Sequence, residues 1–208
     1  MSVTFAYVGR SLDAAFDLVT RNHRAWDKFD LTVEGFFRSF WAIPLVAPMN
    51  VITDIIANNI SDAARIADGK EALNQSYGYS DAAFSTVALC FQWMIFPLAM
   101  IVVLRFLGLA QRYSALIIAH NWGTVVIYLV NMPAFLLFQA GFISAGVAID
   151  LNLLALMFTL YYRFYTAQSA LDAGWSVAAS TAMLGLVLQL YFQIGLSFAA
   201  GLWLPASP

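Results

Sequence analysis

The amino-acid sequence predicts an all-α fold: a polytopic membrane bundle of five transmembrane helices with a peripheral N-terminal amphipathic helix. One reason is composition, since 62% of the 208 residues are hydrophobic and only 11% are charged. Soluble domains have about 45–50% apolar and about 25% charged residues. The other reason is that five apolar segments reach the roughly 20 residues needed to cross a bilayer core. A soluble chain of this size could not bury so much apolar surface.

The first predicted unit, residues 1–35, is a cytoplasmic amphipathic segment. Apolar residues recur there at steps of three and four, which is the period of one helix face, and Ser11 stands where an N-cap is expected. The helix could lie on the inner membrane surface or pack under its own bundle, and the sequence leaves both open. The residues of this face are Leu12, Phe16, Val19, His23 and Trp26.

The second unit, residues 36–208, holds the five predicted spans. Span one contains two prolines, Pro44 and Pro48, and span five is rich in small residues that allow close helix contact. The start of span four is ambiguous, because residues 139–149 are apolar but contain glycine, so they could lie along the interface with Asp150 as the N-cap. The spans cover about 36–57, 83–109, 114–138, 145–168 and 176–204.

Lysine and arginine predict the orientation, because positive residues stay on the cytoplasmic side. With five spans, eight of the ten lysines and arginines fall on the side of the N-terminus, and only Arg65 and Lys70 fall on the other. We therefore expect a multi-pass protein of a bacterial inner membrane, with a cytoplasmic N-terminus and a periplasmic C-terminus. Arg38, Arg105 and Arg163 stand near the inner ends of spans, where long side chains reach phosphate headgroups. They are predicted to anchor the helices.

Two groups of polar residues fall inside the spans, where such residues are costly and are therefore candidates for function. The first is an outer-leaflet cluster that could bind a cation or share a proton; it consists of Asp54, Asn131, Asp150 and Asn152. The alternative places both acids in the wet headgroup region.

The second group is an interhelical polar seam in span three, made of His120, Asn121, Thr124 and Tyr128. Hydrogen bonds between helices account for such a seam, and the wall of a polar cavity is the alternative. Whether His120 ligates a pigment or haem stays open, since a single histidine is weak evidence for either.

Motifs of catalysis and of metal binding are not found in the sequence, so no catalytic residue, metal site or cofactor is predicted. Neither GxSxG, HExxH nor a phosphate-binding glycine loop occurs. The single cysteine, Cys90, excludes an internal disulfide. Since the ten basic residues form no long tract, nucleic acid is not expected as a partner.

Three segments carry a family resemblance: "WDKFDLTVEGFFRSFWAIPLVAPMNVI", "AHNWGTVVIYLVNMP" and "LYYRFYTAQSAL". Together they resemble a group of small inner-membrane proteins of alphaproteobacteria that are similar to the Yip-type five-span family. The resemblance implies five helices, a cytoplasmic N-terminus and no catalytic residues. It extends over spans one, three and four.

The function predicted from the sequence is that of a non-enzymatic membrane scaffold or an accessory subunit of a membrane complex. Its expected partners are membrane lipids and other membrane proteins or further copies of itself. The alternative is a small transporter or channel that uses the outer-leaflet cluster. No sequence feature names a partner or a substrate.

Overall fold

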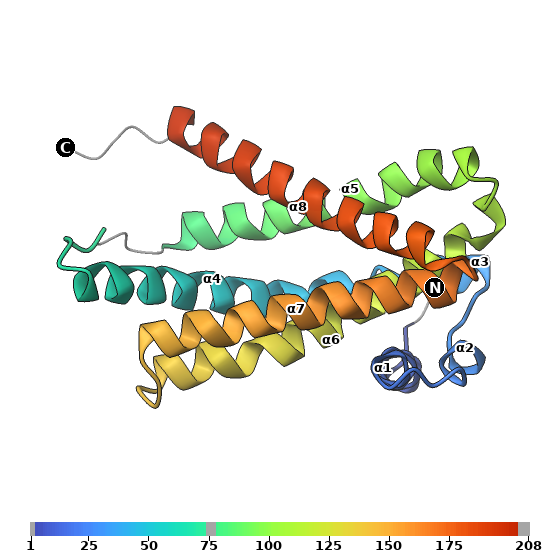
Figure 1. The fold of residues 1–208 in the computed structure, drawn as a ribbon, viewed down its shortest axis with the longest axis horizontal. Helices are drawn as coiled ribbons and strands as arrows, with labels where there is room; N and C mark the ends of the chain where they lie inside the picture. Colours follow the sequence, from blue (N-terminus) through green and yellow to red (C-terminus); the bar gives the residue numbers. More distant parts are fainter. Residues whose placement is uncertain (1–2, 74–77, 204–208) are drawn as a thin grey trace.

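The computed structural model describes residues 3–73 and 78–203, and these residues form helices joined by turns. Five long helices run side by side, while the first helix is seen end-on and so crosses their direction (Figure 1). The N-terminal helices are α1 (Phe5–Val19), α2 (Ala25–Lys28) and α3 (Val33–Ser39). The long helices are α4 (Ala42–Ala67), α5 (Tyr79–Phe106), α6 (Tyr113–Gln139), α7 (Ala145–Leu171) and α8 (Trp175–Trp203), and the short 3-10 helix η1 (Ala110–Arg112) precedes α6.

The predicted fold class is confirmed. Five stretches are long and apolar enough to cross a membrane, and they correspond to the five predicted spans; they are Val33–Ala67, Tyr79–Phe106, Ala110–Gln139, Ala145–Leu171 and Trp175–Leu196. The first differs most from its predicted bounds, since a break between Ser39 and Ala42 separates α3 from α4, and α4 then runs ten residues past 57. Pro44 falls in the first turn of α4, where backbone N–H groups have no helical partner to lose.

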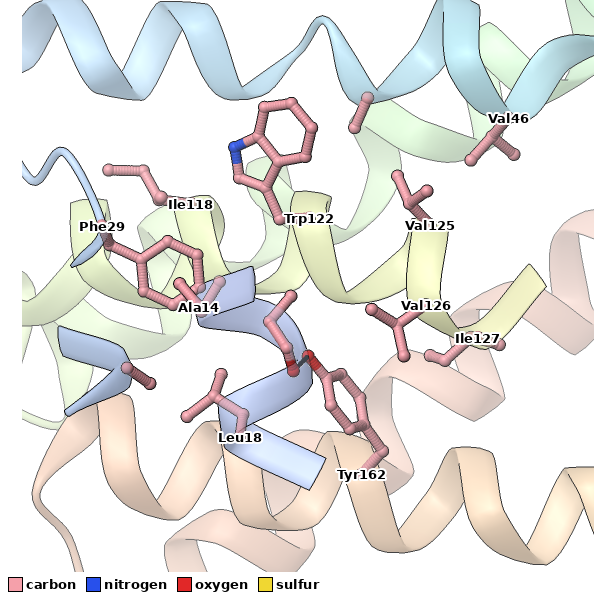
Figure 2. Close-up of a cluster of buried hydrophobic side chains, with 14 of the residues drawn as sticks. Ala14, Leu18, Phe29, Val46, Ile118, Trp122, Val125, Val126, Ile127 and Tyr162 are labelled. Carbon is pink, nitrogen blue, oxygen red and sulfur yellow. Dashed lines mark hydrogen bonds between the residues drawn. The ribbon is translucent and has the colours of Figure 1, made fainter. Parts of the chain in front are cut away.

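Helix α6 is central, because it packs against α1, α3, α4 and α7. Its Trp122 is fully buried in a cluster that includes Val46 of α4 and Tyr162 of α7. Figure 2 shows Ala14 and Leu18 of α1 beside these side chains. The apolar core therefore lies toward one end of the bundle, where α1 closes it. Helices α7 and α8 meet at this end and diverge toward the C-terminal end of α8 (Figure 1).

The N-terminal helix packs on the bundle, through a face that only partly matches the one predicted. Its N-cap is Thr4, whose hydroxyl oxygen accepts a hydrogen bond from the Tyr7 N–H at 3.2 Å, and Ser11 lies buried in mid-helix. Of the predicted face, Phe16 and His23 are exposed, whereas Leu12, Val19 and Trp26 are partly buried against the core. Small side chains decide the docking, since they let the helix approach α6 closely, whereas a periodicity argument gives weight to large apolar ones. The buried face is Tyr7, Ser11, Ala14, Ala15 and Leu18.

The turn between α6 and α7 resolves the ambiguity at residues 139–149. Helix α6 ends at Gln139, Gly141 takes a positive φ of 76° that favours glycine, and α7 begins at Ala145. Its N-cap is Ser144, whose hydroxyl oxygen accepts from the Val147 N–H at 3.4 Å. Asp150 therefore lies in the second turn of α7, and the prediction that it caps this helix is wrong.

Candidate functional site: a polar cavity inside the bundle

A cavity of about 350 Å³ lies between α4, α6, α7 and α8. Its wall mixes apolar side chains such as Ile127 and Leu156 with several that can hydrogen-bond. The polar residues of the wall are Thr53, Thr124, Tyr128, Asn131, Asn152, Thr159, Arg163 and Gln189. Polar groups at this position in a helix bundle are unusual, because the surrounding bilayer offers them no hydrogen-bond partner.

A smaller hollow of about 70 Å³ adjoins it between α5, α6, α7 and α8. The two share Thr124, Tyr128, Arg163 and Gln189, so these residues stand at their junction. The smaller hollow adds two polar side chains, His120 of α6 and Gln92 of α5. We name the two hollows together the Arg163 cavity, because Arg163 is the charged residue common to both walls.

The position of Arg163 corrects a prediction. The sequence suggested that this residue anchors the inner end of a span, but it lies eight residues before the end of α7, which is about 12 Å along the helix axis. Its side chain lines the cavity, and its Nε atom is buried. Gly185 of α8 lies beside the guanidinium, since a methyl group there would be in van der Waals contact with one of its terminal nitrogens, at 3.5 Å. Arg163 is thus an interior cation.

Within residues 3–73 and 78–203, Arg163 has no counter-ion. No carboxylate of this part of the chain forms an ion pair with it, and no group accepts a hydrogen bond from its Nε. Arg38 provides the contrast. It too was predicted to reach lipid headgroups, but its guanidinium pairs with Asp30 and Glu34 and lies over the ring of Tyr7. Carboxylates of the protein neutralise Arg38, whereas no described carboxylate neutralises Arg163.

Three of the four seam residues face this cavity: His120, Thr124 and Tyr128. His120 stacks on Phe96 of α5, with ring centroids 4.2 Å apart. Thr124 donates to the backbone oxygen of His120 at 2.9 Å. A neutral imidazole offers one hydrogen-bond donor and one acceptor, so His120 can add a polar contact to a bound molecule. No described contact bears on a pigment or haem at this residue.

The fourth seam residue, Asn121, points the other way and joins three helices. Trp93 of α5 donates its indole N–H to the Asn121 side-chain oxygen at 2.8 Å, and Asn121 donates to the Ser39 hydroxyl oxygen of α3 at 2.8 Å. Asn121 is completely buried. Its role is structural, because each polar group of its side chain is used within the protein. It faces neighbouring helices rather than lipid, as the sequence predicted.

The predicted outer-leaflet cluster does not assemble into one site. Asn131 and Asn152 line the same cavity, although each donates to its own helix, to Ile127 O at 2.7 Å and Ala148 O at 2.9 Å. Asp150 is exposed on α7. The carboxylate of Asp54 accepts a hydrogen bond from the Ser85 hydroxyl group of α5 and another, at 3.1 Å, from the Asn50 side chain of its own helix α4. Asn131 and Asn152 thus share the wall of one cavity, whereas Asp54 and Asp150 are not part of that wall.

Sequence reasoning missed Arg163, Thr159 and Gln189 as parts of this wall. A signal was present on α7, since Asn152, Thr159 and Arg163 follow at steps of seven and four and therefore share one helix face. The inner-end position of Arg163 suggested snorkelling, which hid that stripe. Gln189 of α8 faces the protein interior, because it lines both hollows of the cavity.

Comparisons with known proteins add no relative. No protein-family model, no curated protein and no solved structure matches this chain. The Yip-type resemblance therefore stays a prediction, and function has to be argued from the cavity itself.

Proposed function

We propose that this multi-pass membrane protein binds a small organic anion in the Arg163 cavity and carries it across the membrane. The observation that supports the proposal best is an interior arginine whose charge no described carboxylate balances. Membrane orientation enters the proposal from the lysine and arginine bias, with the N-terminus in the cytoplasm of a bacterial inner membrane.

The charge argument starts from the cost of burying an ion. An unpaired cation away from water costs several kcal/mol, and this cost falls only when an anion with good hydrogen-bond geometry arrives. Arginine is suited to that role, because its planar fork of N–H donors matches a carboxylate, sulfonate or phosphate oxygen pair. An ionisable residue that faces the interior of a membrane bundle is a functional candidate for the same reason.

The size and lining of the cavity describe the rest of the ligand. A volume of about 350 Å³ lies in the range of ligand sites, which run from about 300 to 1,000 Å³. The wall beyond Arg163 offers the amides of Asn131, Asn152 and Gln189 together with apolar side chains. These groups fit an uncharged body of mixed polarity. Since Arg163 is the one charged side chain among the described residues that line this wall, a single negative charge on the ligand neutralises the site.

A binding experiment with molecules of one shape tests the charge requirement. Purified protein in lipid nanodiscs is titrated calorimetrically with benzenesulfonate, neutral benzenesulfonamide and cationic benzylammonium. We expect saturable binding of the anion alone. Arg163→Gln should weaken it by roughly ten- to a hundredfold, the loss of a charge-assisted contact. Arg105→Gln is the matched control, because Arg105 is exposed at the end of α5.

Three results would contradict the proposal. The first is binding of the sulfonamide as tight as that of the sulfonate. The second is unchanged binding in Arg163→Gln while the Arg105→Gln control behaves as wild type. The third is no saturable binding of the anion by the wild-type protein.

The scaffold or accessory-subunit function stays a second prediction, with lipids and other membrane proteins as its partners. It makes a different demand, namely a stoichiometric partner after gentle detergent extraction, seen by mass spectrometry. Loss of anion binding in Arg163→Gln without loss of such a partner would assign the two properties to different surfaces.

A further inference from the structure

A hydrogen-bonded chain connects the Arg163 cavity to a carboxylate. The Tyr128 hydroxyl group, in the wall of the cavity, donates to the Asn50 side-chain oxygen at 2.7 Å. The amide nitrogen of Asn50 donates to Asp54 Oδ2 at 3.1 Å, and to the Ser85 hydroxyl oxygen at 2.7 Å. Ser85 itself donates to Asp54 Oδ2. Helices α4, α5 and α6 thus meet in one polar network inside the membrane-spanning region.

Among the described acids, Asp54 shares the lack of a lysine or arginine partner with Asp27, Asp62, Glu71, Asp81 and Asp150. It differs from these acids because its hydrogen bonds join two membrane-spanning helices, α4 and α5. Asp13, Asp17, Asp30, Glu34, Asp68 and Asp172 each pair with a lysine or arginine. The hydrogen bonds of Asp54 come from the neutral groups Asn50 and Ser85, and its side chain is part-buried. The negative charge of a carboxylate held in this way inside a membrane is not balanced by a cation. Binding a proton therefore removes the free-energy cost of keeping that charge away from water.

None of the described charged or titratable groups around Asp54 forms an ion pair with it. A proton is therefore the simplest cation that can balance the charge of its carboxylate. From α6 the titratable neighbour is Tyr128, which is linked to Asp54 through the Asn50 side chain. From α7 comes Arg163, which interacts with Tyr128 but forms no ion pair with Asp54. From α5 the neighbour is Ser85, which does not titrate, while Asp81 one turn earlier binds the Gly78 N–H.

A metal ion fits this network less well than a proton. Calcium takes about six to eight oxygen ligands, whereas Asp54 meets one hydroxyl group and the amide nitrogen of Asn50. The carbonyl oxygen of Asn50 is already used by Tyr128. The donors present can hold a carboxyl group in place, but they do not form a coordination shell.

We propose that Asp54 takes up the proton that accompanies the anion through the membrane; this inference rests on the transport function proposed above. One proton from water binds the carboxylate of Asp54, one anion binds at Arg163, and both leave on the other side. No bond other than O–H forms or breaks. The paired movement is electroneutral, and the chain through Asn50 and Tyr128 lets each site respond to the occupation of the other.

Proteoliposomes loaded with the purified protein test the coupling. Labelled benzenesulfonate is the probe, because it stays ionised at every pH used and its own titration cannot imitate coupling. With one proton per anion, a pH difference of one unit, acid outside, should concentrate the anion about tenfold. A potassium–valinomycin potential should leave uptake by the wild type unchanged.

Asp54→Asn removes the titrating group but keeps a side chain of the same shape. We expect it to abolish the roughly tenfold pH-driven accumulation, while exchange of internal for external benzenesulfonate persists and shows that the protein is folded. Asp150→Asn is the matched control, since Asp150 is an exposed acid on α7, and it should accumulate the anion as the wild type does.

The outcomes separate the two proposals. Accumulation by Asp54→Asn equal to that of the wild type overturns the role of Asp54 but leaves the anion site intact. Wild-type uptake that does not depend on the pH gradient would likewise overturn the role of Asp54 and leave the anion site intact. Loss of binding selectivity in the nanodisc titration overturns the anion site, and with it the coupling.

Discussion

The hydroxyl group of Tyr162 on α7 donates a hydrogen bond to the backbone oxygen of Ala15, 3.1 Å away on α1. Both residues are buried, and Figure 2 shows the Tyr162 side chain pointing toward α1. This contact lies between the predicted cytoplasmic segment and the spans, and it holds the N-terminal helix against α6 and α7. Tyr162 directly precedes Arg163 in α7. The same helical turn therefore docks α1 through Tyr162 and lines the cavity through Arg163.

Tyr162→Phe should loosen the N-terminal helix. The change removes one buried hydrogen bond without changing the packing of the ring, so we expect the protein to lose about 1 kcal/mol of stability. Protease cleavage after Arg24 should become faster. Tyr161→Phe is the control, because the Tyr161 hydroxyl meets Arg21 at an exposed site, and it should change cleavage little. Equal rates for wild type and Tyr162→Phe would show that this bond does not hold α1.

Gly123→Ala should be markedly destabilising. A methyl group at Gly123 would lie 2.7 Å from the Tyr162 hydroxyl oxygen and closer still to its ring. Overpacking of this kind costs about 1–3 kcal/mol, and here it also pushes on the docking contact of α1. At Gly9, in mid-helix on α1, an added methyl group meets nothing within 4 Å. Gly9→Ala should therefore stabilise by roughly 0.5–1 kcal/mol. Thermal unfolding of both variants in detergent compares them.

Asn121→Ala should destabilise more than His120→Leu, although the two residues are adjacent. Alanine at 121 leaves the buried Trp93 N–H and the Ser39 hydroxyl group without this partner, at a cost of about 1–3 kcal/mol. As a member of the predicted interhelical seam, His120 would lose roughly 1 kcal/mol on substitution by leucine if one hydrogen bond between helices were removed. His120 stacks on Phe96 and faces the cavity instead, so that loss should be smaller. Chemical denaturation in mixed micelles ranks the two variants, and the reverse order would show that His120 is the structural residue.

Hydropathy was enough to predict the spans, because a bilayer requires about 20 apolar residues in each crossing helix. It could not predict the cavity. Whether a polar side chain such as Arg163 turns toward lipid headgroups or toward the interior depends on which helices pack against its face, and that is a property of three-dimensional contacts. The same limit applied to α1, where small residues such as Ala14 and Ala15 form the docking face. Predicting the seam succeeded for Asn121, whose amide needs buried partners, but the sequence did not show that Asn121 and His120 serve opposite faces of one helix.

The junction of α1 and α2 should be stable over a wide pH range and weaken at both extremes. Lys28 meets Asp13 and Asp17, each at 2.6 Å. The hydrogen bond from Lys28 holds the pKa of Asp17 below its usual value, and the bonds to Asp13 and Asp17 raise the pKa of Lys28. A lowered acid pKa stabilises the fold above about pH 3.9 and is lost as pH falls through the folded value. A raised lysine pKa stabilises below about pH 10.4 and is lost as pH rises through its folded value.

Amide hydrogen exchange of residues 5–28, corrected for the pH dependence of the intrinsic rate, measures this junction. We expect faster exchange below about pH 3.9 and above about pH 10.4, relative to peptides of α6 in the same sample. In Asp17→Asn the acid-side change should shrink, since the titrating group is gone. An acid-side change of equal size in that variant would assign the effect to other carboxylates.

The topology prediction follows from the distribution of positive charge and sets the direction of transport. Reporter fusions should place residues 5 and 170 in the cytoplasm and residues 70 and 207 outside. Seven of the ten lysines and arginines fall on the side of the N-terminus, Arg65 and Lys70 fall on the other, and Arg163 lies inside the bundle. The side with more positive charge stays cytoplasmic. In this orientation Asp54 lies on the outward side of Asn50 along α4, so its proton comes from outside. A cytoplasmic reporter signal at residue 207 would contradict five crossings. Outside signals at 5 and 170, with cytoplasmic signals at 70 and 207, would keep the bundle but reverse the direction of the proton.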